Sequence, residues 1–148
     1  MEVFYPYNHS FIVHEGESCA VHSWVNWDLA NMTAILAIGI LTDDNAKINE
    51  AVNYYKYTGK GSGYIGNGIP FIHQDPDSNE RLGQCQESRR DLGHTSLCAG
   101  MLAIFCKMAS NVEEDLLAYD DYAVLAMFEY FAKYNVGTSE IKFSDGKS

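Results

Sequence analysis

The feature that most constrains this fold is the run over residues 27–41, which is apolar on nearly every side when it is read as a helix. Its length and its content of Ala, Leu and Met favour a buried helix over a strand. A helix without a polar face needs neighbours on every side. We therefore expect this helix inside the fold, completed either by more helices than this chain supplies or by a homodimer.

Three further helices are predicted after this one. The segment 42–45 supplies stop and N-cap residues, which predicts a second helix over 44–58. Residues 59–83 are rich in Gly and Pro, which predicts a long loop of the kind that is usually functional. Apolar stripes then predict helices over 86–110 and 115–135.

These elements predict one all-α domain over residues 1–148, built of antiparallel helical hairpins. Residues 1–22 lack clear periodicity and are expected to form an irregular arm. Residues 138–148 are expected to form a frayed, polar tail.

The charge balance excludes two classes of partner. The chain has 20 acidic and 10 basic residues and a net charge of -10, so it repels nucleic acid and anionic membranes. The same repulsion acts against an acidic polysaccharide unless basic residues gather in one cleft. The N-terminus is not a signal peptide, and no stretch reaches the roughly 20 apolar residues of a membrane span, so we expect no membrane association.

The four cysteines carry no metal or redox motif. Cys19, Cys85, Cys98 and Cys106 include no C-x-x-C pair, which argues against a zinc site. Cys98 and Cys106 are too far apart along one helix to bridge each other. Buried free thiols are the expected state.

The densest polar cluster lies in residues 83–94. If this segment is helical, Glu87, Arg90, Asp91 and His94 lie on one face that continues into an apolar stripe. A half-buried row of this kind needs paired charges or a ligand; a solvated first turn stabilised by the helix dipole is the alternative. A metal site is disfavoured because Arg90 would repel a cation, so we predict no metal and no cofactor.

A second candidate site lies where the apolar helix begins. Asn26 stands where a helix N-cap is wanted, and Asn31 follows one turn later. Trp24 and Trp27 are either core anchors or platforms on which a sugar ring stacks.

Taken together, the chain resembles the alginate lyase family of polysaccharide lyases. The resemblance runs over about residues 4–137 and is carried by Phe4-Tyr5-Pro6, Asn26-Trp27-Asp28, Ala37-Ile38-Gly39-Ile40-Leu41-Thr42-Asp43, Gly83-Gln84-Cys85-Gln86-Glu87-Ser88-Arg89-Arg90-Asp91-Leu92-Gly93-His94 and Glu129-Tyr130-Phe131-Ala132-Lys133-Tyr134-Asn135. Arg89 stands where the family usually has glycine.

The resemblance implies an incomplete (α/α) toroid that cleaves a uronate-containing polysaccharide, of the alginate or glucuronan type, by β-elimination. By position, Asn26 would neutralise the uronate carboxylate, His94 would neutralise it or act as the base, and Arg90 would help to hold the site. The residues that would bind substrate are Trp24, Trp27, Asn31, Gln84, Gln86, Glu87 and Arg89. Gln84, Gln86 and Glu87 would contact sugar hydroxyls or orient His94. A periplasmic or secreted location is also implied.

The family carries a later segment with a second Arg and an acid/base Tyr that nothing in this sequence matches. The chain is therefore expected to be a lyase fragment that is inactive alone, or one completed by a second copy. A carbohydrate-binding helical module without chemistry is the alternative, and a hydrolase using Glu87 and Asp91 as paired carboxylates is a weaker one.

Overall fold

The computed structural model describes residues 3–18, 23–88 and 90–136. The elements in the described residues, in chain order, are α1 (Phe4–His14), α2 (Val25–Thr42), α3 (Asn45–Tyr57), α4 (Ile65–Gly68), β1 (Phe71–Gln74), β2 (Arg81–Gln84), α5 (Leu92–Ser110) and α6 (Tyr119–Asn135). The prediction of a helical protein is confirmed, with the addition of a small sheet.

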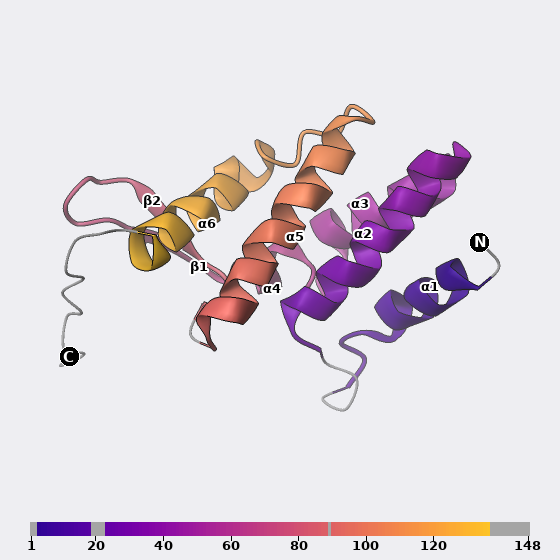
Figure 1. Ribbon diagram of the computed structural model, residues 1–148, viewed down its shortest axis with the longest axis horizontal. Helices are drawn as coiled ribbons and strands as arrows, with labels where there is room; N and C mark the ends of the chain where they lie inside the picture. Colours follow the sequence, from indigo (N-terminus) through magenta and orange to yellow (C-terminus); the bar gives the residue numbers. More distant parts are fainter. Residues whose placement is uncertain (1–2, 19–22, 89, 137–148) are drawn as a thin grey trace.

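Four helices form a row in the order α1, α2, α5, α6, each packing on the next (Figure 1). α3 packs against α2 from behind this row, and β2 packs against α6. The row therefore places α2, the apolar helix of the sequence, between three helical neighbours.

α2 is the buried helix that the sequence predicts. Met32, Ile35 and Leu36 are completely buried in its middle. It is not covered on every side, however, because Trp27 and Leu41 are exposed at its two ends. Asp44 is the N-cap of α3 and accepts hydrogen bonds from the backbone N–H groups of the first turn, so the predicted boundary at 44–58 is accurate.

α2 and α5 each have the length and mean hydropathy, 1.3 in both, of a helix that could cross a membrane. In the folded chain 44% of the α2 window and 33% of the α5 window are buried. α2 also carries the fully buried, acidic Asp28. The absence of membrane association remains a prediction.

The expectation of an irregular arm over residues 1–22 is wrong for the described part, which contains α1. This helix buries only Ile12, so its sequence has no strong apolar period to signal it. Contacts with α2 and α3 hold α1 in place. The Tyr5 hydroxyl donates to Glu50 Oε2 of α3 at 2.7 Å, and the ring of Phe11 stacks on Trp27 of α2.

The predicted loop over residues 59–83 contains α4 and a two-stranded antiparallel hairpin. Phe71 pairs with Gln84 and Gln74 with Arg81. All of β1 is exposed, so no apolar alternation marks it as a strand. Lys133 of α6 holds the hairpin, with its Nζ 2.6 Å from Oδ2 of the buried Asp75.

The helix predicted over 86–110 begins only at Leu92, after a turn over residues 85–91. Asp91 is its N-cap and accepts from the backbone N–H of His94 at 2.8 Å. The expected single helical face of Glu87, Arg90, Asp91 and His94 is therefore wrong, because only His94 is inside the helix. The Asp-Leu-Gly sequence offers a better cap than the preceding Gln and Glu, and that decides the boundary.

The last helix, predicted over 115–135, begins at Tyr119. Its first turn departs from helical geometry, because Asp120, Asp121 and Tyr122 all have positive φ. The expected tail over 138–148 lies outside the described residues. The row of helices does not establish an (α/α) toroid, which stays a prediction.

Candidate functional site

The turn over residues 85–91 joins the end of β2 to the start of α5, and it lies against the start of α2. Gln86 ties these parts together. Its backbone N–H donates to the Gly68 carbonyl at 2.9 Å, its side-chain oxygen accepts from the Val25 N–H at 2.8 Å, and its amide donates to Ser62 Oγ at 3.0 Å. Gln86 therefore positions the site, because both ends of its side-chain amide are used within the protein.

Glu87 is completely buried beneath this turn. One carboxylate oxygen, Oε2, lies 3.5 Å from Nη1 of Arg90, and the backbone carbonyl of Glu87 accepts from Thr95 Oγ1 at 2.9 Å. Among the described residues, Oε1 of Glu87 has no hydrogen-bond partner. A buried carboxylate is costly unless it is paired, so Glu87 holds Arg90 at the surface of the turn.

Arg90 lies over an aromatic ring that comes from the other side of the site. Its guanidinium carbon is 5.2 Å from the ring centroid of Trp24, the residue that precedes α2. Trp24 is 48% exposed, and the Arg90 side chain is 37% exposed. The pair offers an anionic sugar two kinds of contact: a cation for the carboxylate and an aromatic ring for the apolar face of the sugar.

His94 lies in the first turn of α5 with its ring held by the N-cap residue. Its Nδ1 is 2.5 Å from Oδ2 of Asp91, while the backbone N–H of His94 donates to Oδ1 of the same carboxylate. These two hydrogen bonds from His94, backbone first, lower the pKa of Asp91 below its usual value. The carboxylate fixes Nδ1, so Nε2 is the ring nitrogen left to meet a ligand.

Asn26 is not the N-cap that the sequence suggests. It lies inside the first turn of α2 and is 5% exposed, while Trp24 takes the cap position. Its Nδ2 donates to the backbone carbonyl of His94 at 3.1 Å. Asn26 therefore holds the first turn of α5 against α2.

The side chains of three other predicted substrate residues contact other parts of the protein. Trp27 stacks on Phe11 of α1, and Asn31 donates its side-chain N–H to the Trp27 carbonyl at 2.8 Å. Gln84 lies on β2, with its side-chain oxygen 3.0 Å from Nε2 of His73 on β1. Arg89 lies outside the described residues.

Sequence reasoning missed a buried polar cluster behind α2. Asp28 is completely buried, and its Oδ2 accepts from the Tyr54 hydroxyl at 2.8 Å and from the Gly63 N–H at 2.7 Å. Glu15 is also buried nearby and lies beside Gly61. The sequence feature that could have indicated this cluster is Asp28, an acidic residue inside an otherwise apolar helix.

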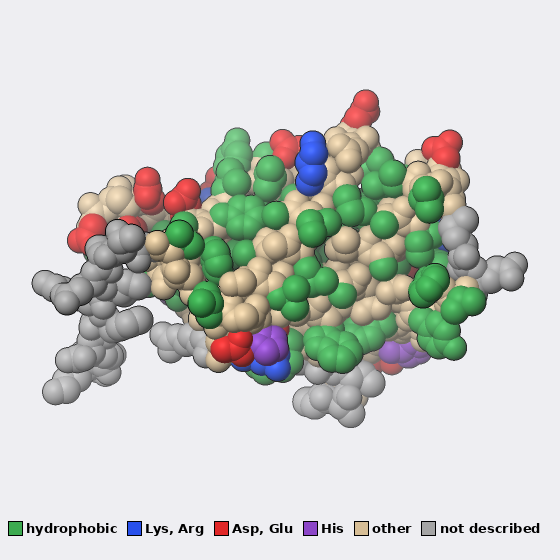
Figure 2. Space-filling model, viewed as in Figure 1, with side chains coloured by type: hydrophobic (Ala, Val, Ile, Leu, Met, Phe, Trp, Pro, Cys, Tyr) green, Lys and Arg blue, Asp and Glu red, His purple; other side chains and the backbone are tan. Residues whose placement is uncertain are grey.

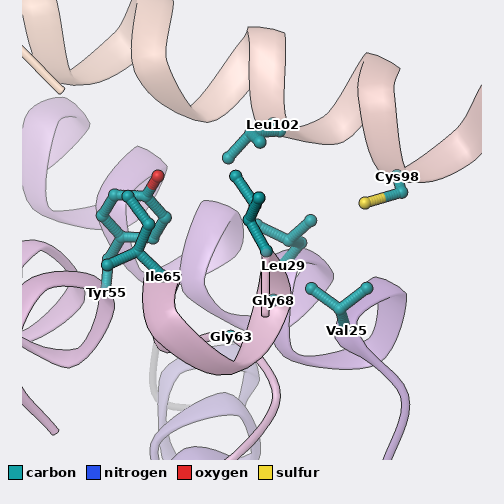
Figure 3. A pocket seen from close by; sticks show the side chains of 9 residues that line it. Val25, Leu29, Tyr55, Gly63, Ile65, Gly68, Cys98 and Leu102 are labelled. Carbon is teal, nitrogen blue, oxygen red and sulfur yellow. The ribbon is translucent and has the colours of Figure 1, made fainter. Parts of the chain in front are cut away.

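Several hollows in the described part of the chain lie outside the cluster of Trp24, Arg90 and His94. An enclosed apolar cavity of about 10 Å³ lies between α5 and the α2–α4 side (Figure 3). It is too small for a sugar. An open groove of about 550 Å³ runs between α1 and α3, lined by residues that include His9, Glu50, Asn53, Tyr57 and Lys60.

In the described ranges, no three His, Cys, Asp or Glu side chains gather closely enough to hold a metal ion. Comparisons of this chain with protein-family models, curated proteins and solved structures find no match. The resemblance to alginate lyases therefore remains a prediction.

Proposed function

We propose that the surface formed by Trp24, Arg90 and His94 binds a uronate unit of an anionic polysaccharide, within a β-elimination site of the polysaccharide lyase type. The observation that carries the proposal is the Arg90 guanidinium lying over the exposed Trp24 ring. Four residues further along the chain, the half-exposed ring of His94 is held by Asp91. The chain as a whole is strongly acidic, so a locally placed cation is needed for such a substrate.

The arrangement suggests a role for each group. Arg90 pairs with the uronate carboxylate and stabilises the charge that develops when C5 loses its proton. Trp24 stacks on the apolar face of the sugar ring. His94 takes the C5 proton on Nε2, because its Nδ1 is occupied by Asp91. The electrons of the C5–H bond form the C4–C5 double bond, the C4–O4 bond breaks, and the departing O4 takes a proton from solvent water.

Three residues position other groups of the site in this proposal and do not touch the substrate: Asn26, Gln86 and Glu87. Asn26 is buried against His94, so its contribution is to hold the base and not to touch the uronate carboxylate. Glu87 orients Arg90 from below. The proposal extends to a periplasmic or secreted protein and to a row of helices that is part of an incomplete (α/α) toroid.

The test is incubation of the protein with alginate and with glucuronan, followed by ultraviolet absorbance of the unsaturated product. With a second copy completing the site, we expect a rise in absorbance that His94→Ala lowers by about 100-fold, the usual scale for loss of a general base. His14→Ala removes an exposed histidine on α1 and is the matched control that retains activity.

Two outcomes would contradict elimination. Release of reducing sugar without absorbance would indicate hydrolysis. No product, together with glycan binding that Trp24→Ala removes, would favour a carbohydrate-binding module that uses the same surface. Absence of both binding and product would overturn the proposal, including its form in which a second copy completes the site.

A further inference from the structure

Cys85 and Cys98 occupy neighbouring positions in the core although they belong to different elements. Cys85 begins the turn that follows β2, and Cys98 lies on the buried face of α5. Both are almost fully buried, at 2% and 1% exposure. Neither has a part in the proposed elimination chemistry.

Two hydrogen bonds fix the position of the turn, one to α5 and one to α4. Thr95, one helical turn before Cys98, donates from Oγ1 to the Glu87 carbonyl at 2.9 Å. On the other side, the Gln86 N–H donates to the Gly68 carbonyl at 2.9 Å, and Gly68 lines the same cavity as Cys98. Figure 3 shows the Cys98 sulfur turned from α5 towards this cavity.

The side chains of Cys85 and Cys98 are hydrogen-bonded to each other. A hydrogen bond from the Cys98 thiol, assisted by one from Ser88 Oγ at 3.4 Å, lowers the pKa of Cys85 below the usual thiol value. The contact with Cys85 and burial raise the pKa of Cys98. The nearby Glu87 carboxylate raises the pKa of both thiols. The hydrogen bond therefore makes the Cys85 sulfur the nucleophile and the Cys98 thiol the proton donor.

We propose that Cys85 and Cys98 are a built-in oxidation site that a peroxide converts to an intramolecular disulfide. Hydrogen peroxide is suited to a buried pair because it is only slightly larger than water and reaches the sulfur when the turn opens locally. The disulfide would join the two ends of the segment between Cys85 and Cys98, which contains Gln86, Glu87, Arg90 and His94. This inference does not depend on the proposed lyase function.

The reaction balances in two steps. The Cys85 sulfur attacks one oxygen of hydrogen peroxide and the O–O bond breaks, which gives a sulfenic acid and one water. The Cys98 sulfur then attacks the sulfenic sulfur, the S–O bond breaks, and the hydroxyl leaves as a second water with the thiol proton. Two thiols are oxidised, and one peroxide is reduced to two waters.

The other two cysteines serve as internal references. Cys106 lies on α5 two turns beyond Cys98, and burial raises its pKa to about 12, so it is expected to react slowly. Cys19 lies outside the described residues. Replacing Cys19 and Cys106 with Ser leaves a chain whose two remaining thiols are the proposed pair.

The test treats this two-cysteine variant with hydrogen peroxide, blocks free thiols, and digests the protein with trypsin without reduction. Cleavage after Arg81, Arg89, Arg90 and Lys107 places Cys85 in peptide 82–89 and Cys98 in peptide 91–107. We expect these peptides to be joined, with the loss of two hydrogen atoms in mass and with separation on reduction. Cys85→Ser and Cys98→Ser in the same background must each abolish the joined species.

Two comparisons sharpen the result. Oxidation in concentrated urea is expected to join the peptides at least about tenfold more slowly, because the fold supplies the proximity. Between about pH 7 and pH 9 the oxidation rate of the folded protein should rise less steeply than that of an ordinary thiol, because the lowered pKa of Cys85 leaves more of this thiol ionised at neutral pH.

The proposal is overturned if both thiols remain free or oxidise separately to sulfinic acids while the chain stays folded. It is equally overturned if the peptides are joined only between two chains, as a dimer on a non-reducing gel. If the two-cysteine variant does not fold, the same digest of the unaltered chain is decisive, because fragmentation of peptide 91–107 distinguishes Cys98 from Cys106.

Discussion

At the scale of single residues, the most constrained polar contact is the one between Tyr54 and Asp28. The Tyr54 hydroxyl and the Gly63 N–H donate to the same buried carboxylate oxygen. Gly61 completes the site, because a Cβ at this position would lie 2.0 Å from the Tyr54 oxygen and its φ is +53°. Backbone and side chain together therefore solvate an acid that the apolar helix alone could not bury.

Tyr54→Phe should destabilise the fold by about 1–3 kcal/mol, because it removes one donor from a buried carboxylate. Urea unfolding at neutral pH measures this change. Tyr57→Phe is the control, since Tyr57 is 66% exposed on the same helix, and it should shift the unfolding midpoint little. Equal effects of the two substitutions would contradict a special role for the Tyr54 hydrogen bond.

The same contact predicts a loss of stability in alkali. Burial first, and then the negative charge and hydrogen bond of Asp28, raise the pKa of Tyr54 well above its usual value of 10.0. Above pH 10.0 the unfolded chain therefore loses a proton that the folded chain keeps, so the free energy of unfolding falls as pH rises. Urea midpoints measured across this range should fall less steeply for Tyr54→Phe, and parallel curves would contradict the assignment.

At the scale of elements, the close approach of β2 to α6 depends on one residue without a side chain. A Cβ on Gly83 would lie 2.7 Å from the backbone nitrogen of Met127 and 3.0 Å from its Cα. Backbone atoms of a helix cannot move aside as the end of a side chain can. The packing of the hairpin on α6 therefore requires glycine here.

Gly83→Ala should lower the free energy of unfolding by about 1–3 kcal/mol, the usual cost of overpacking. Gly100→Ala is the matched control. Gly100 lies within α5 and a Cβ there meets nothing within 4 Å, so the same substitution should stabilise the helix by about 0.5–1 kcal/mol. Thermal or urea unfolding distinguishes the two, and a destabilised Gly100→Ala or a neutral Gly83→Ala would contradict this packing.

At the scale of the whole molecule, the row of helices leaves apolar side chains in solvent. α5 buries Cys98, Leu102 and Phe105 on one side but exposes Leu97 and Ile104 on the other. Figure 2 shows apolar side chains distributed over this face of the row, which has acidic groups along its upper edge. The predicted homodimer would bury this apolar face against a second copy of the chain.

The homodimer prediction is tested by light scattering of the purified chain against the monomer mass of 16.6 kDa. We expect twice that mass, reduced to the monomer by Ile104→Asp in the outer face of α5. Val136→Asp is the control, because Val136 is 66% exposed just beyond the end of α6 and should leave the mass unchanged. A monomer at all concentrations would show that the homodimer prediction is wrong.

Local pattern was enough to identify α2 and α3, because continuous apolarity and the capping Asp44 act over a few residues. It was not enough for α1 or the hairpin, whose exposed sequences are held by contacts with distant elements. The site residues divide in the same way. The sequence indicated the polar segment around Glu87, Arg90 and His94. Because Asp91 caps α5, however, Glu87 and Arg90 lie in a turn before the helix and not on a helical face.

Tertiary structure alone decided which of these residues face solvent. It stacked Arg90 on Trp24, buried Asn26 and Glu87, and directed Trp27 towards α1. It also brought Cys85 to Cys98. The physical reason is that short-range propensities fix where a helix begins and ends, whereas the meeting of side chains from separate elements depends on how whole apolar faces pack.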